Sequence, residues 1–490
     1  MTAPAGIAML ATVAALLIVT GLPAWIILLA VALAAAVAGV AGGVFTWPIL
    51  TAIPARLIGL LENDLLQALP LYVLMGALLH RLPLADTLFR VGRHALRGSA
   101  AAAPLAGLGI GALLAPMNGS VGASVAMLGR TLLPRLDAAE MPAEQSAALV
   151  CVASTLGVVI PPSLVLILLA DAMMRAHTEA LNATGASARI VNTQEIFVGA
   201  LVPAAMLICL FAVVAWTTTR RRATPARRPE RPSVGACITA AATCAFIGVL
   251  LLGVTFGYLY AVEAAATGAV VLALSGFATR ALTARILHTV LRDAITITGA
   301  LFALLVGATT FTLVVRAYET DRWVAAVLAT LPGGAPAALF VVLAGLALCA
   351  LVLDAFELIF VVVPVLMPAL LMRVPDVTWV SVLALLILQL GFVTPPFGYA
   401  ILMLRKHLAR PLPTPRLARA LAPYLVAQVA VVVLVLAYPP LVWHRSGSPS
   451  DAALPGAAPP TDDEARRMME RQLQRNDNDV REPAAAHEGR

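Results

Sequence analysis

A polar stretch interrupts an otherwise apolar segment of membrane length in the first half of the chain. It runs from Met117 to Ser124 and contains Asn118, Gly119 and Ser120. Asparagine and serine oxygens, together with backbone carbonyls freed by glycine, suit a hard cation that has lost its water. We therefore interpret Asn118, Gly119, Ser120 and Ser124 as candidate binding residues for a cation or for substrate. Helix packing through small residues is the alternative, and at Ser124 the two explanations are nearly balanced.

A second polar group, Ser154, Thr155 and Gly157, stands shortly before the proline pair Pro161-Pro162. We expect this group to lie opposite the first stretch. A helix end that the prolines leave exposed would also attract an anionic substrate, because its free backbone N–H groups carry partial positive charge. The sequence therefore predicts that both groups contribute to one binding site.

The second half of the chain has a carboxylate, Asp354, inside an apolar segment. A charged group at membrane depth is costly unless it is paired or functional. We interpret Asp354 as a residue of a cation site or a gate, with a structural hydrogen bond as the alternative. Glu357 lies three residues further on, which places it on the same helix face. Glu357 is equally well explained as a salt-bridge partner.

Other polar residues of the second half complete the candidate site. Gly391 and Thr394 precede a second proline pair, Pro395-Pro396. Adjacent threonines at positions 309 and 310 either bond a helix carbonyl or line the cavity, and the sequence does not separate these roles. Two arginines at the expected outer boundary of the membrane are interpreted as surface anchors. The threonines are Thr309 and Thr310, and the arginines are Arg316 and Arg322.

The two proline pairs occupy matching positions in a duplicated pattern. Pro134 precedes the first pair by the same number of residues as Pro368 precedes the second. Helix-breaking residues at corresponding positions of two halves indicate the binding site of a secondary transporter. Broken helices at membrane depth are tolerated only around a polar cavity. The alternative is that Pro161, Pro162, Pro395 and Pro396 merely kink ordinary spans.

Composition defines the class of protein that must position these residues. The chain is 61% hydrophobic and 12% charged, whereas soluble domains carry about 25% charged residues. The apolar runs are too long for barrel strands. We therefore predict an all-α polytopic membrane protein embedded in the lipid bilayer. The net charge of +7 lies mostly in loops and implies no nucleic-acid partner. The five cysteines make no metal-ligand spacing and no expected disulfide.

Matching segments divide the chain into two predicted inverted repeats with re-entrant hairpins and broken helices. Amphipathic segments 43–61 and 277–295 are expected to form arm helices along the bilayer surface. The predicted parts are repeat 1–217 with hairpin 100–133 and broken helix 143–171, a basic cytoplasmic linker 218–234, repeat 235–443 with hairpin 336–371 and broken helix 378–404, and a disordered polar tail 444–490.

The arginine and lysine content of short loops predicts the orientation. Loops 81–97, 218–232 and 405–419 are rich in these residues and are expected in the cytoplasm. Segment 172–195 has balanced charge and is then expected outside. Counting spans from these loops places the two hairpins on opposite sides of the membrane, which is why the repeats are predicted to be inverted.

At these residues the chain resembles the large membrane (M) subunit of tripartite ATP-independent periplasmic (TRAP) transporters. The motifs that carry the resemblance extend over residues 1–443. They include Asn118-Gly119-Ser120, Ile160-Pro161-Pro162-Ser163, Glu263-Ala264-Ala265-Ala266, Leu353-Asp354, and Gly391 through Gly398. The family usually has Ser-Gly-Ser-Ser at the first stretch, so Asn118 and Val121 depart from its pattern.

The resemblance implies an elevator-type importer of an organic acid in the bacterial inner membrane, with sodium ions as coupling ions and no further cofactor. It implies two separate partners, a small four-helix membrane subunit and an extracytoplasmic solute-binding protein. The sequence lacks a phosphate-binding P-loop, which fits ion coupling. The alternative is a stand-alone sodium/divalent-anion symporter without a binding protein. An enzyme is not expected, because no intramembrane histidine pairs with serine or aspartate at a readable spacing.

Overall fold

Helices make up all the long regular elements of the computed structural model, which describes residues 5–62, 64–96, 99, 101–185, 191–220, 231–408 and 411–442. No strand occurs in these ranges. The all-α membrane fold class predicted from composition is therefore confirmed. The predicted tail 444–490 and most of the basic linker 218–234 lie outside the described residues.

The helices follow one another with short connections. They are α1 (Ala5–Thr20), α2 (Ala24–Ala41), α3 (Ile53–Leu61), α4 (Asp64–Arg81), α5 (Leu84–Ala95), α6 (Ala102–Leu114), α7 (Val121–Asp137), α8 (Ala143–Val159), α9 (Leu164–Thr184), α10 (Thr193–Arg220), α11 (Val234–Thr255), α12 (Ala261–Ala278), α13 (Ala284–Ala317), α14 (Thr320–Thr330), α15 (Gly334–Cys349), α16 (Ala355–Glu357), α17 (Val363–Leu371), α18 (Val377–Val393), α19 (Tyr399–Arg405) and α20 (Thr414–Ala437). Three 3₁₀ turns (Trp47–Ala52, Ala115–Asn118 and Pro439–Leu441) and one π-helical turn (Leu358–Val362) complete them.

Several helices are long and apolar enough to cross a membrane. Among the described residues six pass this test by themselves: α2, α10, α11, α12, α13 and α20. Two further pairs pass it together, although each is sharply bent. The bend is 63° between α4 and α5 and 42° between α8 and α9. The chain is thus a multi-pass membrane protein that also contains broken helices.

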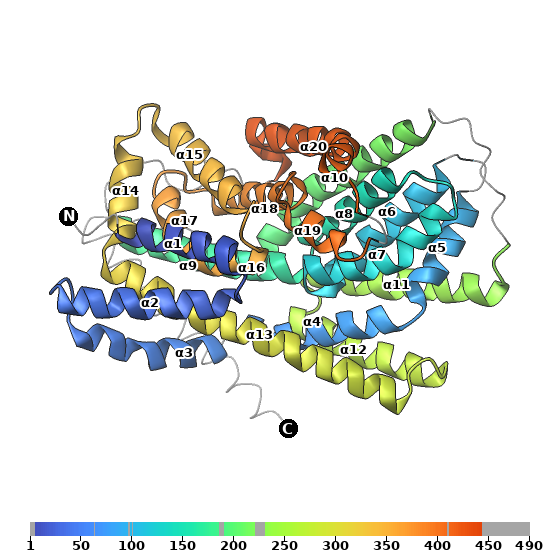
Figure 1. The fold of residues 1–490 in the computed structure, drawn as a ribbon, viewed down its shortest axis with the longest axis horizontal. Helices are drawn as coiled ribbons and strands as arrows, with labels where there is room; N and C mark the ends of the chain where they lie inside the picture. The colour runs from blue at the N-terminus through green and yellow to red at the C-terminus, as the bar shows by residue number, and fades with distance from the viewer. Residues whose placement is uncertain are drawn as a thin grey trace, which may run out of the picture. The chain divides into compact units, whose positions relative to one another are not determined.

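The helices pack in two groups. Figure 1 shows α2 and α4, from the start of the chain, lying beside α12 and α13 from its middle. A second group surrounds α8, which contacts α6, α7, α18 and α20. Every residue of α8 from Ser146 to Val159 is buried, as expected for a helix that is apolar on all sides. The broken helices therefore form the centre of the second group.

The two halves present the same order of elements around their breaks. In the first half α6 and α7 flank a short turn, and α8 and α9 flank Pro161-Pro162. In the second half α15 and α17 flank residues 350–362, and α18 and α19 flank Pro395-Pro396. Both Pro-Pro bonds are cis. Proline has no N–H to continue a helix, so each pair ends the helix before it. The domain boundaries and the opposite orientation of the halves stay predictions.

The second predicted arm helix, 277–295, is wrong as a separate element. α12 runs to Ala278, and the rest of the segment is the beginning of α13, which continues without a break for 34 residues to Ala317. No proline interrupts α13, whereas Pro48 and Pro54 lie in the first-half segment 43–61. That segment does contain the short helix α3 after a 3₁₀ turn.

Two segments expected to be loops are largely helical. Residues 84–95 of the basic segment 81–97 form α5, where Asp86 pairs with Arg90 at 3.4 Å and with Arg135. The segment 172–195 begins as a continuation of α9, which ends only at Gly185 in a left-handed conformation. In both cases charges spaced four apart, such as Asp171 and Arg175, stabilise a helix that polarity alone had hidden.

Single cysteines at the helix ends test the predicted orientation. Thr414 starts α20 within the basic segment 405–419, and Thr330 ends α14 on the predicted outer side. In a cysteine-free chain, a membrane-impermeant thiol reagent added to intact cells should modify Thr330→Cys and leave Thr414→Cys unmodified. Thr414→Cys should react only after the membrane is opened. Its modification in intact cells would contradict the inverted arrangement.

Candidate functional site

The first break is a tight turn held by its own polar side chains. Gly119 has φ 74°, a left-handed conformation that favours glycine. Ser120 caps α7, because its hydroxyl accepts the backbone N–H of Ala123 at 3.2 Å. Asn118 is buried, and its Nδ2 donates to the Ser124 hydroxyl at 3.2 Å. The Ser124 hydroxyl donates in turn to the carbonyl of Ala115 at 3.3 Å.

Glycines allow α4 and α8 to approach this turn at backbone distance. A Cβ placed on Gly157 would lie 2.5 Å from the carbonyl carbon and oxygen of Ala115. A Cβ on Gly76 of α4 would lie 2.9 Å from the Cα of Asn118. In the second half, a Cβ on Gly391 of α18 would lie 2.4 Å from the Cβ of Ala350 and 3.1 Å from its carbonyl carbon and oxygen. Each break is therefore enclosed by a helix that comes closer than any side chain would permit.

A cavity of about 10 Å³ lies beside the first turn, which is about the space of one water molecule. Five predicted residues line it: Gly119, Ser120, Ser124, Ser154 and Gly157. The lining supplies three hydroxyl oxygens and no carboxylate, a neutral donor set that fits a small hard cation.

Two of the first-half candidates are not in that lining. Thr155 is buried and its hydroxyl donates to the carbonyl of Val152 at 3.0 Å. Asn118 contacts the site only through Ser124. Ser154, which does line the cavity, uses its proton on the Val150 carbonyl at 2.6 Å and keeps its lone pairs.

The second break exposes an acidic pair. Asp354 precedes α16, and its backbone N–H donates to Oε2 of Glu357 at 3.1 Å. Asp354 and Glu357 thus form a capping box, in which the side chain of each residue accepts a hydrogen bond from the backbone N–H of the other. Both residues are half-buried. The π-helical turn that follows is a feature that often accompanies functional sites.

Gly391 and Thr394 lie at the end of α18, directly before the second proline pair. Thr394 donates its hydroxyl to the carbonyl of Leu390 at 2.6 Å, and its own carbonyl accepts the N–H of Gly398 at 2.9 Å. The backbone N–H of Thr394 donates to the carbonyl of Gly391 at 3.3 Å, which is the carbonyl that an N–H at position 395 would engage in a continuous helix. The cavity beside the first turn has neither Asp354 nor Gly391 nor Thr394 in its lining.

Tyr399 is a site residue that the sequence interpretation missed. It begins α19, and its ring packs against Phe392 with centroids 6.2 Å apart. A Cβ on Gly122 would lie 3.1 Å from the Tyr399 hydroxyl oxygen. The charges of Asp354 and Glu357 act on this hydroxyl, which places Tyr399 near the second break as well. Tyr399 therefore links the breaks of the two halves. Its position directly after the second proline pair was the available signal.

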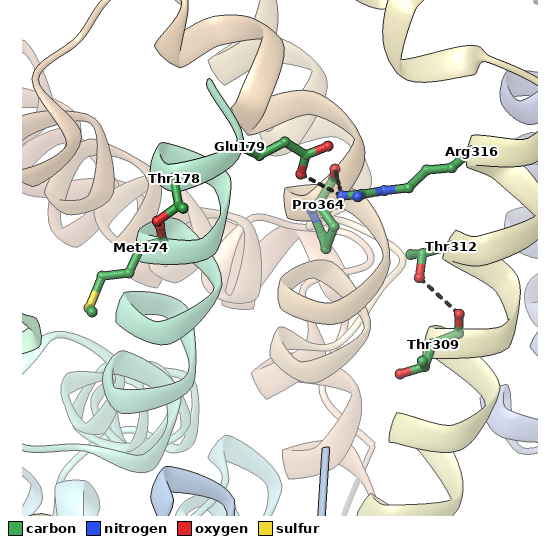
Figure 2. Close-up of polar contacts among 7 residues, drawn as sticks. All are labelled: Met174, Thr178, Glu179, Thr309, Thr312, Arg316 and Pro364. Atoms are coloured by element: carbon green, nitrogen blue, oxygen red, sulfur yellow. Dashed lines mark hydrogen bonds and ion pairs between the residues drawn. The ribbon is translucent and has the colours of Figure 1, made fainter. Parts of the chain in front are cut away.

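A second, larger cavity of about 430 Å³ lies among α3, α9, α13 and the π-helical turn. Thr309 lines it, whereas the hydroxyl of Thr310 donates to the carbonyl of Val306 at 2.8 Å. Arg316, interpreted from the sequence as a surface anchor, also lines this cavity. Figure 2 shows Arg316 extending from α13 to Glu179 of α9, 2.6 Å away. Arg322 instead forms an exposed pair with Glu319.

Comparison with known proteins settles the family. A family profile described as "Tripartite ATP-independent periplasmic transporter, DctM component" matches residues 10–441. The chain belongs to this family. The resemblance seen in the sequence motifs is thereby confirmed, and so is the prediction that the chain is a transporter and not an enzyme.

Relatives of this DctM-family chain are named TRAP transporter permeases. It is 25% identical over 395 residues to the C4-dicarboxylate TRAP transporter large permease protein DctM of Rhodobacter capsulatus, covering 77% of this chain and 86% of that protein. It is 21% identical over 400 residues to the sialic acid TRAP transporter permease protein SiaT of Haemophilus influenzae. That match covers 81% of this chain and 62% of SiaT, so the chain spans less than two thirds of SiaT.

A solved structure shares the fold of this DctM-family chain. The YdaH transporter of Alcanivorax borkumensis superposes with a TM-score of 0.54 at 14% identity, covering 80% of this chain and 88% of YdaH. The crystal structure of YdaH reveals an unusual topology. As a TRAP large permease, the chain is an inner-membrane protein.

Proposed function

We propose that this permease imports an organic acid across the inner membrane, driven by sodium ions. Two relatives support the substrate class, because one is named for C4-dicarboxylates and the other for sialic acid, and both ligands are carboxylates. The family name supports a tripartite system. We assign to it a small four-helix membrane subunit and an extracytoplasmic binding protein that delivers the acid.

The observation that carries sodium coupling is the water-sized cavity lined by Ser120, Ser124 and Ser154. Its oxygens are neutral and its walls are backbone and small apolar side chains, so a cation there would be stripped of water. The acidic pair Asp354 and Glu357 lies on the second break, and Tyr399 lies between that pair and the first break. We propose that cation binding draws the two breaks together.

We propose that transport proceeds by an elevator movement, and the division of the helices into two groups supports this. We propose that the group built around α8 and α18 moves with the substrate. The helices α2, α4, α12 and α13 then remain fixed in the bilayer, against the small subunit. Broken helices suit this role, because their ends present partial charges to the cargo at membrane depth.

Reconstitution tests the proposal. The permease and its small subunit are placed in lipid vesicles, and the cognate binding protein is added outside with a labelled C4-dicarboxylate or with labelled sialic acid. Uptake should require an inward sodium gradient and the binding protein. Uptake that is equally fast with potassium in place of sodium would overturn sodium coupling. Uptake without any binding protein would favour a stand-alone symporter.

Single substitutions at the first break sharpen that assay. Ser120→Ala should raise the sodium concentration needed for half-maximal uptake about tenfold, the loss of roughly 1.4 kcal/mol expected for one oxygen donor in a dehydrated site. Asn118→Ala should act in the same direction but less strongly, because it removes the amide that holds the Ser124 hydroxyl in place. Ser233→Ala is the matched control, since Ser233 caps α11 in the same manner outside the site. An unchanged sodium response in both variants, at normal protein level, would remove the first break from the ion site.

A further inference from the structure

The larger cavity has the size and the walls of a site for a small organic anion. Its volume of about 430 Å³ lies within the range of small-molecule pockets, about 300–1,000 Å³. Ile359, Phe360 and Pro364 supply an apolar wall, and charged residues come from α3, α9 and α13. The apolar wall would therefore pack against the carbon skeleton of an organic anion, and the charged residues would face its charged group.

The charges that line the cavity do not balance. Its five ionisable side chains are three arginines and two acids. Asp171 pairs with Arg175 at 2.9 Å, and Glu179 pairs with Arg316 at 2.6 Å. Among the described residues, the guanidinium of Arg56 has neither an ion pair nor a hydrogen bond. One positive charge is thus left over.

Arg56 and Arg316 also repel each other. Burial and the charge of Arg316 lower the pKa of Arg56, and the charge of Glu179 opposes this only in part. An arginine stays protonated under all ordinary conditions, so a bound anion would relieve the part of this repulsion that Glu179 does not offset. A guanidinium offers a planar fork of N–H donors that matches a carboxylate.

Thr309 adds a neutral donor on the wall that α13 forms. Among the described residues no hydrogen bond engages its hydroxyl, while its carbonyl accepts from Thr312 at 3.1 Å. Figure 2 shows the Thr309 side chain turned away from the axis of α13, on the same side as Arg316 and Glu179. The cavity thus combines a free cation, a free hydroxyl and an apolar wall.

We propose that this cavity binds the carboxylate of a small organic acid, with Arg56 as the principal recognition residue and Thr309 as a second donor. The proposal rests on the proposed function for the identity of the acid as cargo. It locates the anion beside the second break, since Ile359 and Phe360 follow Asp354 by five and six residues. The cation cavity and the anion cavity are then separate sites.

A cysteine at Gly59 reports the charge of the cavity without any transport. Gly59 lines the cavity, and a Cβ there meets nothing within 4 Å. In a cysteine-free permease, the rates of reaction of Gly59→Cys with an anionic and a cationic methanethiosulfonate are compared, each relative to its rate with a free thiol in solution. The anionic reagent should be favoured about tenfold, because unit charges of opposite sign a few Å from a guanidinium differ by about that factor in water.

Variants identify the source of that preference. Arg56→Gln should remove most of it, and Arg56→Lys should retain it. Arg285→Gln, the matched control, removes an exposed arginine at the far end of α13 and should change nothing. Equal relative rates with both reagents in the Gly59→Cys chain that keeps Arg56, or a preference that survives Arg56→Gln, would overturn the proposal.

Protection distinguishes the ligand. Succinate should slow the modification of Gly59→Cys at least about threefold in neutral-lipid nanodiscs, and this protection should vanish in Arg56→Gln. Protection by anionic lipid in the nanodisc, with none by succinate, would assign the cavity to a lipid head group and overturn the proposal. Neither the binding protein nor sodium is present in these measurements. They can therefore succeed when sodium-coupled uptake fails, and fail when it succeeds.

Discussion

Asp354→Asn should abolish most sodium-driven uptake while the protein is still made and inserted. The substitution keeps the shape of the side chain and its ability to cap α16, since asparagine caps helices as well as aspartate. It removes the negative charge. In a partly buried site a unit charge near a cation contributes several kcal/mol, about 4 kcal/mol at 4 Å for an effective dielectric constant of 20. We expect the apparent sodium affinity to fall at least about tenfold.

The control for Asp354→Asn is the same change at another helix start. Asp376 caps α18 by accepting the N–H of Trp379 at 2.9 Å, and it lies away from both breaks in sequence. Asp376→Asn should leave the sodium response unchanged. If Asp354 has only a structural role, Asp354→Asn should transport normally and Asp354→Leu should lower the amount of protein. Normal sodium-driven uptake by Asp354→Asn would refute its place in the ion site.

Gly157→Ala should severely reduce the amount of folded protein. The added Cβ would meet the carbonyl of Ala115 at 2.5 Å, and that carbonyl belongs to the turn that also holds Ser124. Overpacking against side chains costs about 1–3 kcal/mol, and here the obstacle is backbone, which yields less. Fluorescence-detected size exclusion with a heating series should show a lower melting temperature or no folded peak.

Gly109→Ala serves as the matched control on the facing helix. Gly109 is exposed on α6, and a Cβ there meets nothing within 4 Å. The exchange should keep or raise stability, because alanine favours a helix over glycine by about 1 kcal/mol. Gly391→Ala should also lower stability, because its Cβ would lie 2.4 Å from the Cβ of Ala350, with the Ala350 backbone at 3.1 Å. Full stability of Gly157→Ala would mean that the helix can withdraw from the turn at little cost.

The breaks were predictable because their signals are local. Two prolines in succession end a helix whatever surrounds them. A carboxylate inside an apolar segment is costly unless it is paired or functional, so its position alone indicates a role. Most first-half candidates therefore converged on one cavity. The assignment of any of them as ligands stays a prediction.

What the sequence did not reveal depends on partners distant in the chain. Tyr399 matters because Gly122 leaves room for its hydroxyl, and these residues are far apart in sequence. Arg316 resembles a surface anchor unless Glu179 is known to lie beside it. The continuity of α13 was hidden by polar residues such as Arg292, which are equally typical of a surface helix. In segment 277–295, the sequence pattern of a separate surface helix is the same as that of the polar face of a long helix.

The unbroken helix α13 fixes a length inside the molecule. Asp293 pairs with Arg81 of α4 at 3.1 Å, and Arg316 pairs with Glu179 of α9 at 2.6 Å. At 1.5 Å per residue these two attachment points lie about 35 Å apart along one hydrogen-bonded rod. A continuous helix cannot shorten or stretch without losing its ladder of backbone bonds. A shift of α9 relative to α4 along the axis of α13 that exceeds the reach of these side chains would therefore break at least one of the two ion pairs.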